Sequence, residues 1–173
     1  SAMLASLALT SSCQGGGGTP TPTPTPTSTI PVTLTQQSAA RLLNQATFGA
    51  TYDTISAAQG QSYDQWFAAQ AATAPSLTSP LVAANPSGGW TQYWWHNAVL
   101  GPDQLRQRMA FALSEILVVG GSPDQATGQA PNLAAYYDIL VSDSLGNYRK
   151  LLEDVTLSPE MGLYLNMFRN DKP

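Results

Sequence analysis

The sequence predicts an all-α fold, an irregular multi-helix domain that follows a flexible linker. Apolar residues recur at spacings of three and four along several segments, which is the period of one helix face. Helix start and stop signals bound these segments, and no segment alternates apolar and polar residues as a half-buried strand does. We therefore expect one helical domain with a packed core over residues 35–173.

Each expected helix has a local start signal. The first expected helix is capped by Thr35 and runs to about Phe48, the second opens with a capping box at 62–65, and the third spans Trp90–Leu100. The fourth opens at Pro102 and Asp103 and ends at Gly120 and Gly121, and the fifth opens at Pro131. The sixth is capped by Asn147, and the seventh opens with Ser158, Pro159 and Glu160. Residues 73–89, which are rich in proline and end in a glycine pair, are expected to form a loop. In the helix after Pro102, one apolar face is predicted from Leu105, Met109, Ala112, Ile116 and Val119.

Composition excludes several classes of function. Hydrophobic residues make up 43% of the chain and charged residues 10%, with a net charge of −4 and no basic patch. Nucleic acid is therefore not an expected partner. The chain has one cysteine, Cys13, and one histidine, His96. They cannot form a disulfide framework, a cysteine cluster for zinc or a histidine pair, so no metal and no cofactor is expected.

The surroundings of Cys13 predict how the protein is attached. A short apolar run of small residues precedes it, and four glycines with Thr-Pro repeats follow it. This order is typical of a bacterial lipoprotein, in which the cysteine carries lipid and a flexible tether follows. The alternative is an incidental free cysteine. We expect a leader at 1–13 with lipidation at Cys13, a linker at 14–34, and a membrane-anchored location in the cell envelope, periplasmic or on the cell surface.

Residues 65–102 contain no Asp, Glu, Lys or Arg, whereas 15 of the 18 charged residues lie at 103–172. The same uncharged stretch holds all four tryptophans. Such a stretch is either buried or covered by a partner. Core packing is the simpler interpretation. The alternative makes Trp90, Trp94 and Trp95 a ligand-binding surface, because sugar rings stack on aromatic faces.

Four charged residues are candidates for catalysis. Arg108 and Glu115 lie two helical turns apart on one side of an otherwise apolar helix, where a buried ion pair would fix packing rather than catalyse. Glu153 and Asp154 are adjacent, so on a helix they point to different sides and do not by themselves form a glycosidase pair. Motifs for phosphate loops, nucleophile elbows and zinc proteases are absent from the sequence. The sequence contains no complete catalytic constellation.

Three motifs resemble the start of the bacterial family called domain of unknown function 1800. They read Ala-Ala-Arg-Leu-Leu-Asn-Gln-Ala-Thr-Phe-Gly at 39–49, Gly-Pro-Asp-Gln-Leu-Arg-Gln-Arg-Met-Ala-Phe-Ala-Leu-Ser-Glu at 101–115, and Gly-Asn-Tyr-Arg-Lys-Leu-Leu-Glu-Asp-Val-Thr-Leu-Ser-Pro-Glu-Met-Gly at 146–162. The resemblance covers roughly residues 38–172. It implies a largely helical, exported protein, of which this chain is an amino-terminal portion truncated at Pro173. The resemblance also implies that several residues of this chain are shared with other members of the family, although no catalytic role is agreed for them. These residues are Arg41, Asn44, Arg106, Arg108, Glu115, Glu153, Asp154 and Asn166.

Three functions remain open at this point. The first is a binding or assembly module of the envelope, anchored by lipid, for polysaccharide or an exported partner protein. The alternative is the amino-terminal part of an extracellular polysaccharide-active hydrolase or lyase, in which Arg108, Glu115, Glu153 and Asp154 would face one cleft. The third is a structural role without a ligand.

Overall fold

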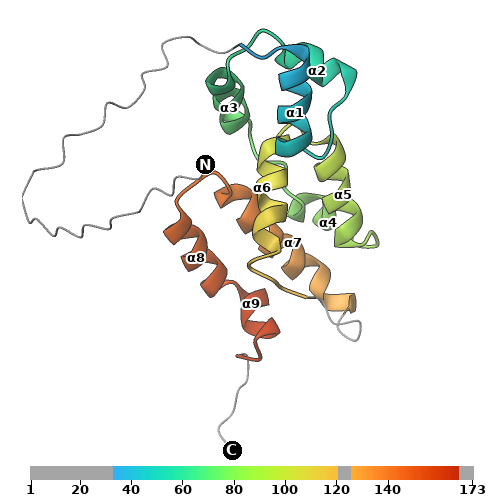
Figure 1. The fold of residues 1–173 in the computed structure, drawn as a ribbon. Coiled ribbons are helices and arrows are strands. Elements are labelled where there is room, and N and C mark those ends of the chain that lie inside the picture. Colours follow the sequence, from blue (N-terminus) through green and yellow to red (C-terminus); the bar gives the residue numbers. More distant parts are fainter. Residues whose placement is uncertain (1–32, 121–125, 168–173) are drawn as a thin grey trace, which may run out of the picture. The chain divides into compact units, whose positions relative to one another are not determined.

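The computed structural model describes residues 33–120 and 126–167, and for 126–129 the backbone alone. All of these residues belong to one compact unit, 31–173. Within the described ranges the chain forms nine helices, no strand, and one isolated bridge between Thr33 and Ser62 (Figure 1). The prediction of an all-α domain is confirmed. The predicted lipidation site, Cys13, and the linker up to residue 32 lie outside the described ranges.

The first three helices each begin with a capping box. They are α1 (Gln36–Ala46), α2 (Tyr52–Ala58) and α3 (Tyr63–Ala72). Their caps are Thr35, Thr51 and Ser62, and each cap exchanges hydrogen bonds with the residue three positions later. The sequence analysis did not predict α2, because its box closes with Thr54 instead of the usual Glu or Gln.

A short helix, α4 (Ser79–Ala84), interrupts the segment that was predicted to be a loop, so the loop prediction for 73–89 was wrong over these residues. Thr78 makes no capping hydrogen bond with its side chain. The carboxylate of Asp138 instead accepts hydrogen bonds from the backbone N–H groups of Thr78 and Ser79, at 2.7 and 2.9 Å. The group that caps α4 therefore comes from a helix some 60 residues away, where no local pattern can indicate it.

The next two helices frame the centre of the unit. Helix α5 (Trp90–Leu100) has the predicted bounds. Helix α6 (Gln104–Ser114) ends earlier than predicted, and Ile116 beyond it is 72% exposed. The predicted apolar face was also wrong, because Met109 and Ala112 are exposed. The residues of α6 that are buried are Leu105, Arg106, Gln107, Ala110 and Ser114.

The polar side chains of α6 are buried because α6 packs against four other helices. Helix α6 contacts α1, α3, α5 and α7, so several helices cover it and the side that carries Met109 and Ala112 remains exposed (Figure 1). A helix surrounded in this way can bury polar groups only if each finds hydrogen-bond partners on its neighbours. This requirement determines the geometry described below.

The chain ends in α7 (Ala126–Asp143), α8 (Tyr148–Leu157) and α9 (Pro159–Tyr164). Helix α7 begins before Pro131, so the predicted start at this proline was wrong; the proline lies inside the helix, where it lacks only one backbone donor. The predicted cap Asn147 of α8 and the predicted start of α9 are confirmed, although the side chain of Ser158 makes no capping hydrogen bond. The side chain of Asn147 accepts from the backbone N–H groups of Arg149 and Lys150, and α9 begins at Pro159.

Two apolar clusters form the core. The first joins α1, α2 and α3 to α6 and consists of Leu34, Ala39, Leu42, Leu43, Ala58, Trp66 and Leu105. The second joins α6, α7 and α8 and consists of Ala110, Tyr136, Leu140, Val141, Leu151 and Val155. Helix α6 contributes to both, so it connects the amino-terminal and carboxyl-terminal halves of the core. In the described part of the chain, no helix has the length and hydrophobicity to cross a bilayer.

Candidate functional site

The three tryptophans predicted to bind a ligand lie on α5, in three different environments. Trp94 is buried and belongs to an aromatic cluster, with ring centroids 6.0 Å from Phe48 and 5.9 Å from Phe111. Trp90 is half-buried against Tyr137, at 4.9 Å. Trp95 is 53% exposed, and its ring meets Trp94 edge-on at 4.6 Å. Of the three, Trp95 is therefore the one whose ring can meet a ligand.

Trp95 lies on an uncharged helical face. Thr91, Gln92, Trp95, His96 and Val99 are all exposed, and each lies three or four residues from another member of the set, which places them on one side of α5. We call this set the α5 outer face. It offers an indole, a hydroxyl, an amide and an imidazole to solvent, on a helix without carboxylates or basic side chains of the lysine or arginine type.

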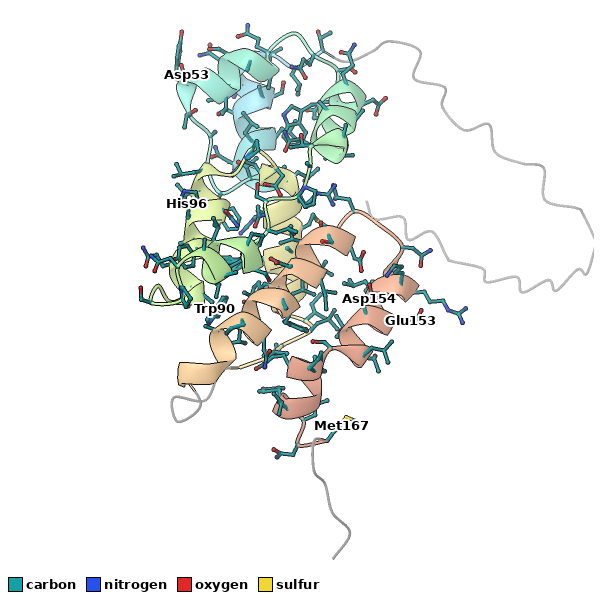
Figure 2. The ribbon with its side chains drawn as sticks, turned by 180° about the vertical axis from the view of Figure 1, so that it is seen from behind. Asp53, Trp90, His96, Glu153, Asp154 and Met167 are labelled. Atoms are coloured by element: carbon teal, nitrogen blue, oxygen red, sulfur yellow. The ribbon has the colours of Figure 1, made fainter. Side chains whose placement is uncertain are left out.

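The four charged candidates do not form one cleft. The guanidinium of Arg108 lies over the rings of Phe48 and Phe111, 5.5 and 5.6 Å from their centroids, and is held by cation–π contacts. Glu115, the residue that ends α6, is exposed. Glu153 and Asp154 lie on α8, which packs against α7 and α9, on the other side of α7 from Trp90 (Figure 2).

Asp154 has a carboxylate partner that the sequence analysis missed. Its side chain forms an ion pair with Lys150 and lies close enough to the carboxyl of Asp143, the last residue of α7, for the two acids to affect each other's pKa. Burial and the hydrogen bond to Asp154 raise the pKa of Asp143, whereas the hydrogen bonds from Lys150 and Asp143 lower the pKa of Asp154. The sequence contained one signal for Asp143: it is an acid in the last turn of a predicted helix, where its charge opposes the helix dipole.

Asp103, Gln107 and Asn97 form a buried polar network around Ser76. The carboxylate of Asp103, fully buried, accepts from the backbone N–H of Ser76 at 2.9 Å and from Nε2 of Gln107 at 3.1 Å. The amides of Gln107 and Asn97 both donate to the backbone carbonyl of Ser76, at 2.9 and 3.2 Å. This network fastens the segment before α4 to α5 and α6 and occupies Oδ2 of Asp103, whereas the buried Oδ1 of Asp103 has no partner among the described residues.

Arg106 joins the ends of two helices. Its side chain is 9% exposed and donates to the carbonyl of Ala71, in the last turn of α3, at 3.2 Å. It also donates to the carbonyls of Val141 and Ser142, in the last turn of α7, at 3.4 and 3.2 Å. Helix carboxyl ends have unpaired carbonyls and a partial negative charge. The charge of Arg106 is thus balanced by two helix ends, without a carboxylate.

A cavity of about 500 Å³ lies between α1, α2, α3 and the turn that joins α5 to α6. Its walls include Leu43, Ala57, Trp66 and Ala69, and Leu100 lies at its edge. None of Arg108, Glu115, Glu153 and Asp154 lines it. Among the described residues, no group of three or more His, Cys, Asp or Glu side chains is placed to hold a metal ion.

A protein-family model described as protein of unknown function (DUF1800) matches residues 41–173, more than half of the chain. The chain belongs to the DUF1800 family. This confirms the resemblance that the three motifs indicated. No curated protein and no solved structure matches the chain.

In this DUF1800 domain, the contacts of several motif residues explain their identity structurally. The second motif supplies the network acid Asp103 and the helix-joining Arg106, and in the first motif Oδ1 of Asn44 accepts from the backbone N–H of Ala50 at 3.3 Å. The third motif supplies the cap Asn147. Asn166, just after that motif, has a φ of 55°, a left-handed conformation that asparagine adopts more readily than most residues.

Glu160 gives the DUF1800 domain a predictable response to pH. Its side chain is 1% exposed at the start of α9, and burial raises its pKa, partly offset by a hydrogen bond from Asn132. In the unfolded chain the pKa of a glutamate is about 4.3. Between that value and the raised pKa of Glu160 in the folded state, the folded state binds more protons than the unfolded state, so stability falls as pH rises. We expect Glu160→Gln to gain free energy of unfolding relative to the wild type between pH 4 and pH 7, measured by urea unfolding.

The control for Glu160 is Glu153→Gln, since Glu153 is exposed on α8 and undergoes the same change of acid to amide. We expect the gain in free energy of unfolding to be larger in Glu160→Gln than in this exposed control. Equal pH dependence of the two variants would show that the burial of Glu160 does not perturb its titration.

Proposed function

We propose that this DUF1800 domain is a non-catalytic binding module of the bacterial cell envelope, anchored through lipid on Cys13, and that it binds polysaccharide on the α5 outer face. The observation that carries the proposal is Trp95, an exposed indole on a rigid aromatic base within an uncharged surface. The order of leader, cysteine and Gly/Thr-Pro tether supports the anchor.

The α5 outer face suits a neutral polymer for two reasons. First, the ring of Trp95 is held by Trp94 below it, so stacking a sugar on it requires little ordering of the side chain. Second, the neighbours Thr91 and Gln92 offer neutral hydrogen-bonding groups to sugar hydroxyls. An exported partner protein is the other ligand class that an exposed aromatic face accommodates, and it is an outcome of the experiment below.

The experiment compares thermal unfolding of the protein with and without a panel of neutral and anionic envelope polysaccharides. We expect at least one glycan to raise the melting temperature of the wild type, because a ligand that binds the folded state stabilises it. Trp95→Ala should weaken that binding by about tenfold or more, the effect typical of removing a central aromatic anchor. The control is Phe67→Ala, which removes another exposed aromatic ring, on α3.

Three results would count against the proposal in different ways. A glycan shift that survives Trp95→Ala would remove the α5 outer face as the site. A shift lost equally in Phe67→Ala would indicate a general loss of stability. Absence of any glycan shift in the wild type would end the polysaccharide proposal and leave a protein partner as the ligand class.

The second candidate function is catalytic: the domain would be the amino-terminal part of a polysaccharide-active hydrolase or lyase. Asp143 and Asp154 favour it, because burial raises the pKa of Asp143 while Lys150 lowers the pKa of Asp154, and two acids whose environments shift their pKa values apart suit general acid and base roles. The ion pair of Asp154 with Lys150 and the separation from Arg108 and Glu115 weigh against it. Release of reducing ends from a glycan that binds, lost in Asp143→Asn, would favour this candidate over a binding module.

A further inference from the structure

We propose that the cavity between α1, α2, α3 and the α5–α6 turn is a second binding site, which takes a neutral ligand with a mainly apolar body and one amide or hydroxyl group. The cavity volume of about 500 Å³ falls in the range typical of small-molecule sites. The cavity shares only Val99 with the α5 outer face, and the proposal does not depend on polysaccharide binding there.

The absence of charge in the lining selects a neutral ligand. No Asp, Glu, Lys, Arg or His side chain is among the residues that line the cavity. A carboxylate or ammonium group that entered would lose water without gaining an ion pair, which is costly in an apolar environment. Ionised ligands should therefore bind much more weakly than a neutral ligand of the same shape.

Most polar groups of the lining are already occupied, which disfavours a sugar. The hydroxyl of Thr47 donates to the carbonyl of Leu43 at 2.6 Å and accepts from the N–H of Gly49 at 3.2 Å. The amide of Gln104 donates to the carbonyls of Ala98 and Gly101, at 3.0 and 2.8 Å. A sugar with a hydroxyl on nearly every carbon would leave most of these hydroxyls without partners, and unpaired polar groups oppose binding.

Two glutamines retain one free hydrogen-bonding group each. Gln70 uses Oε1 to accept from the backbone N–H of Leu105 at 3.2 Å, and its Nε2 has no partner among the described residues. Gln61 uses Nε2 to donate to the carbonyl of Ala57 at 2.8 Å, and its Oε1 has no partner within the same ranges. One free donor and one free acceptor suit a single amide or hydroxyl group.

The rest of the lining suits an apolar chain. Leu43, Ala58 and Trp66 from three different helices form the inner wall. Val99 and Leu100 at the edge are 62% and 69% exposed, although both are large apolar side chains. Burial of each methylene of a ligand is favourable, so a chain of moderate length can bind without ionic contacts.

The experiment titrates four probes into the ¹⁵N-labelled protein and follows the side-chain amide signals of Gln61 and Gln70. The probes are octanamide, octanoate, octylammonium and maltotriose. We expect octanamide to shift both signals saturably and the two charged analogues to bind about tenfold more weakly or worse, because they lose hydration without a counter-charge. Maltotriose should leave these two signals unshifted.

A pair of adjacent alanines gives a matched test of location. Ala69 lines the cavity and Ala68 does not, and both are exposed on α3. Ala69→Phe should fill the cavity and weaken octanamide binding tenfold or more, whereas Ala68→Phe should leave it within twofold. Helix propensity changes equally in the two variants, and the probe series on the wild type remains decisive even if Ala69→Phe fails to fold.

Several outcomes would overturn the proposal. They are saturable binding of octanoate as tight as that of octanamide, octanamide binding that survives Ala69→Phe, or no saturable shift with any probe. Failure here is separable from failure of the proposed function, because Trp95→Ala leaves every residue of the cavity lining unchanged. It should reduce glycan binding without changing octanamide binding.

Discussion

Arg106→Met is expected to lower the free energy of unfolding by about 2–4 kcal/mol, the range for losing buried hydrogen bonds to a charged donor. Methionine keeps much of the side-chain volume, so the loss reflects the guanidinium group. Without it, the carbonyls of Ala71 and Ser142 at the ends of α3 and α7 lose a donor that they share. Chemical unfolding followed by circular dichroism measures the change.

The control for this prediction is Arg149→Met, because Arg149 is exposed in the first turn of α8. It makes the same change of residue type and should cost less than about 0.5 kcal/mol. Arg106→Lys adds a second test, since one ammonium group cannot reach two helix ends as a forked guanidinium does. Equal losses in Arg106→Met and Arg149→Met would mean that the two helix ends do not need Arg106.

Gly101→Ala is expected to destabilise the fold by about 1–3 kcal/mol more than Gly89→Ala, the usual cost of overpacking. The two glycines flank α5 and have nearly the same backbone conformation, with φ and ψ of −62° and 141° at Gly101 and −66° and 141° at Gly89. A Cβ at Gly101 would collide with the backbone carbonyl of Asn97 and lie 2.9 Å from Oδ1 of Asp103, whereas a Cβ at Gly89 has open space.

Both changes replace glycine by alanine at nearly the same folded conformation, so most of the effect on the unfolded chain cancels; the part that does not cancel arises because Gly101 precedes Pro102, which already restricts its backbone. The difference that remains is the space available for one methyl group beside the buried Asp103 network. Urea unfolding of both variants gives this difference directly. If Gly101→Ala and Gly89→Ala are equally stable, the network around Ser76 can move aside and does not hold α5 and α6 rigidly.

These predictions bear on function through the α5–α6 turn. Gly101 and Pro102 lie in this turn and also line the cavity, while the α5 outer face lies on the helix that leads into it. The buried network of Asp103, Gln107 and Asn97 therefore positions both proposed binding surfaces. Asp103, Gln107 and Asn97 thus join separate segments through their hydrogen bonds.

The sequence by itself determined the helical class, the family and the helix starts whose signals are local. Thr35, Ser62 and Asn147 each cap a helix with their own side chain, and Pro159 begins α9. Capping depends on atoms within three residues of one another, so the pattern of residue types contains all the information needed. The motifs that indicated the DUF1800 family are likewise continuous stretches of chain.

Only the tertiary structure decided which polar groups are buried and what they contact. Asp138 caps α4 from about 60 residues away, Arg106 joins α3 to α7, and Asp143 meets Asp154 between two helices. The cavity and the exposure of Trp95 also depend on how separate helices pack. A buried polar side chain on α6 breaks the apolar period of the helix, and it is stable there because neighbouring helices supply hydrogen-bond partners that no local pattern contains.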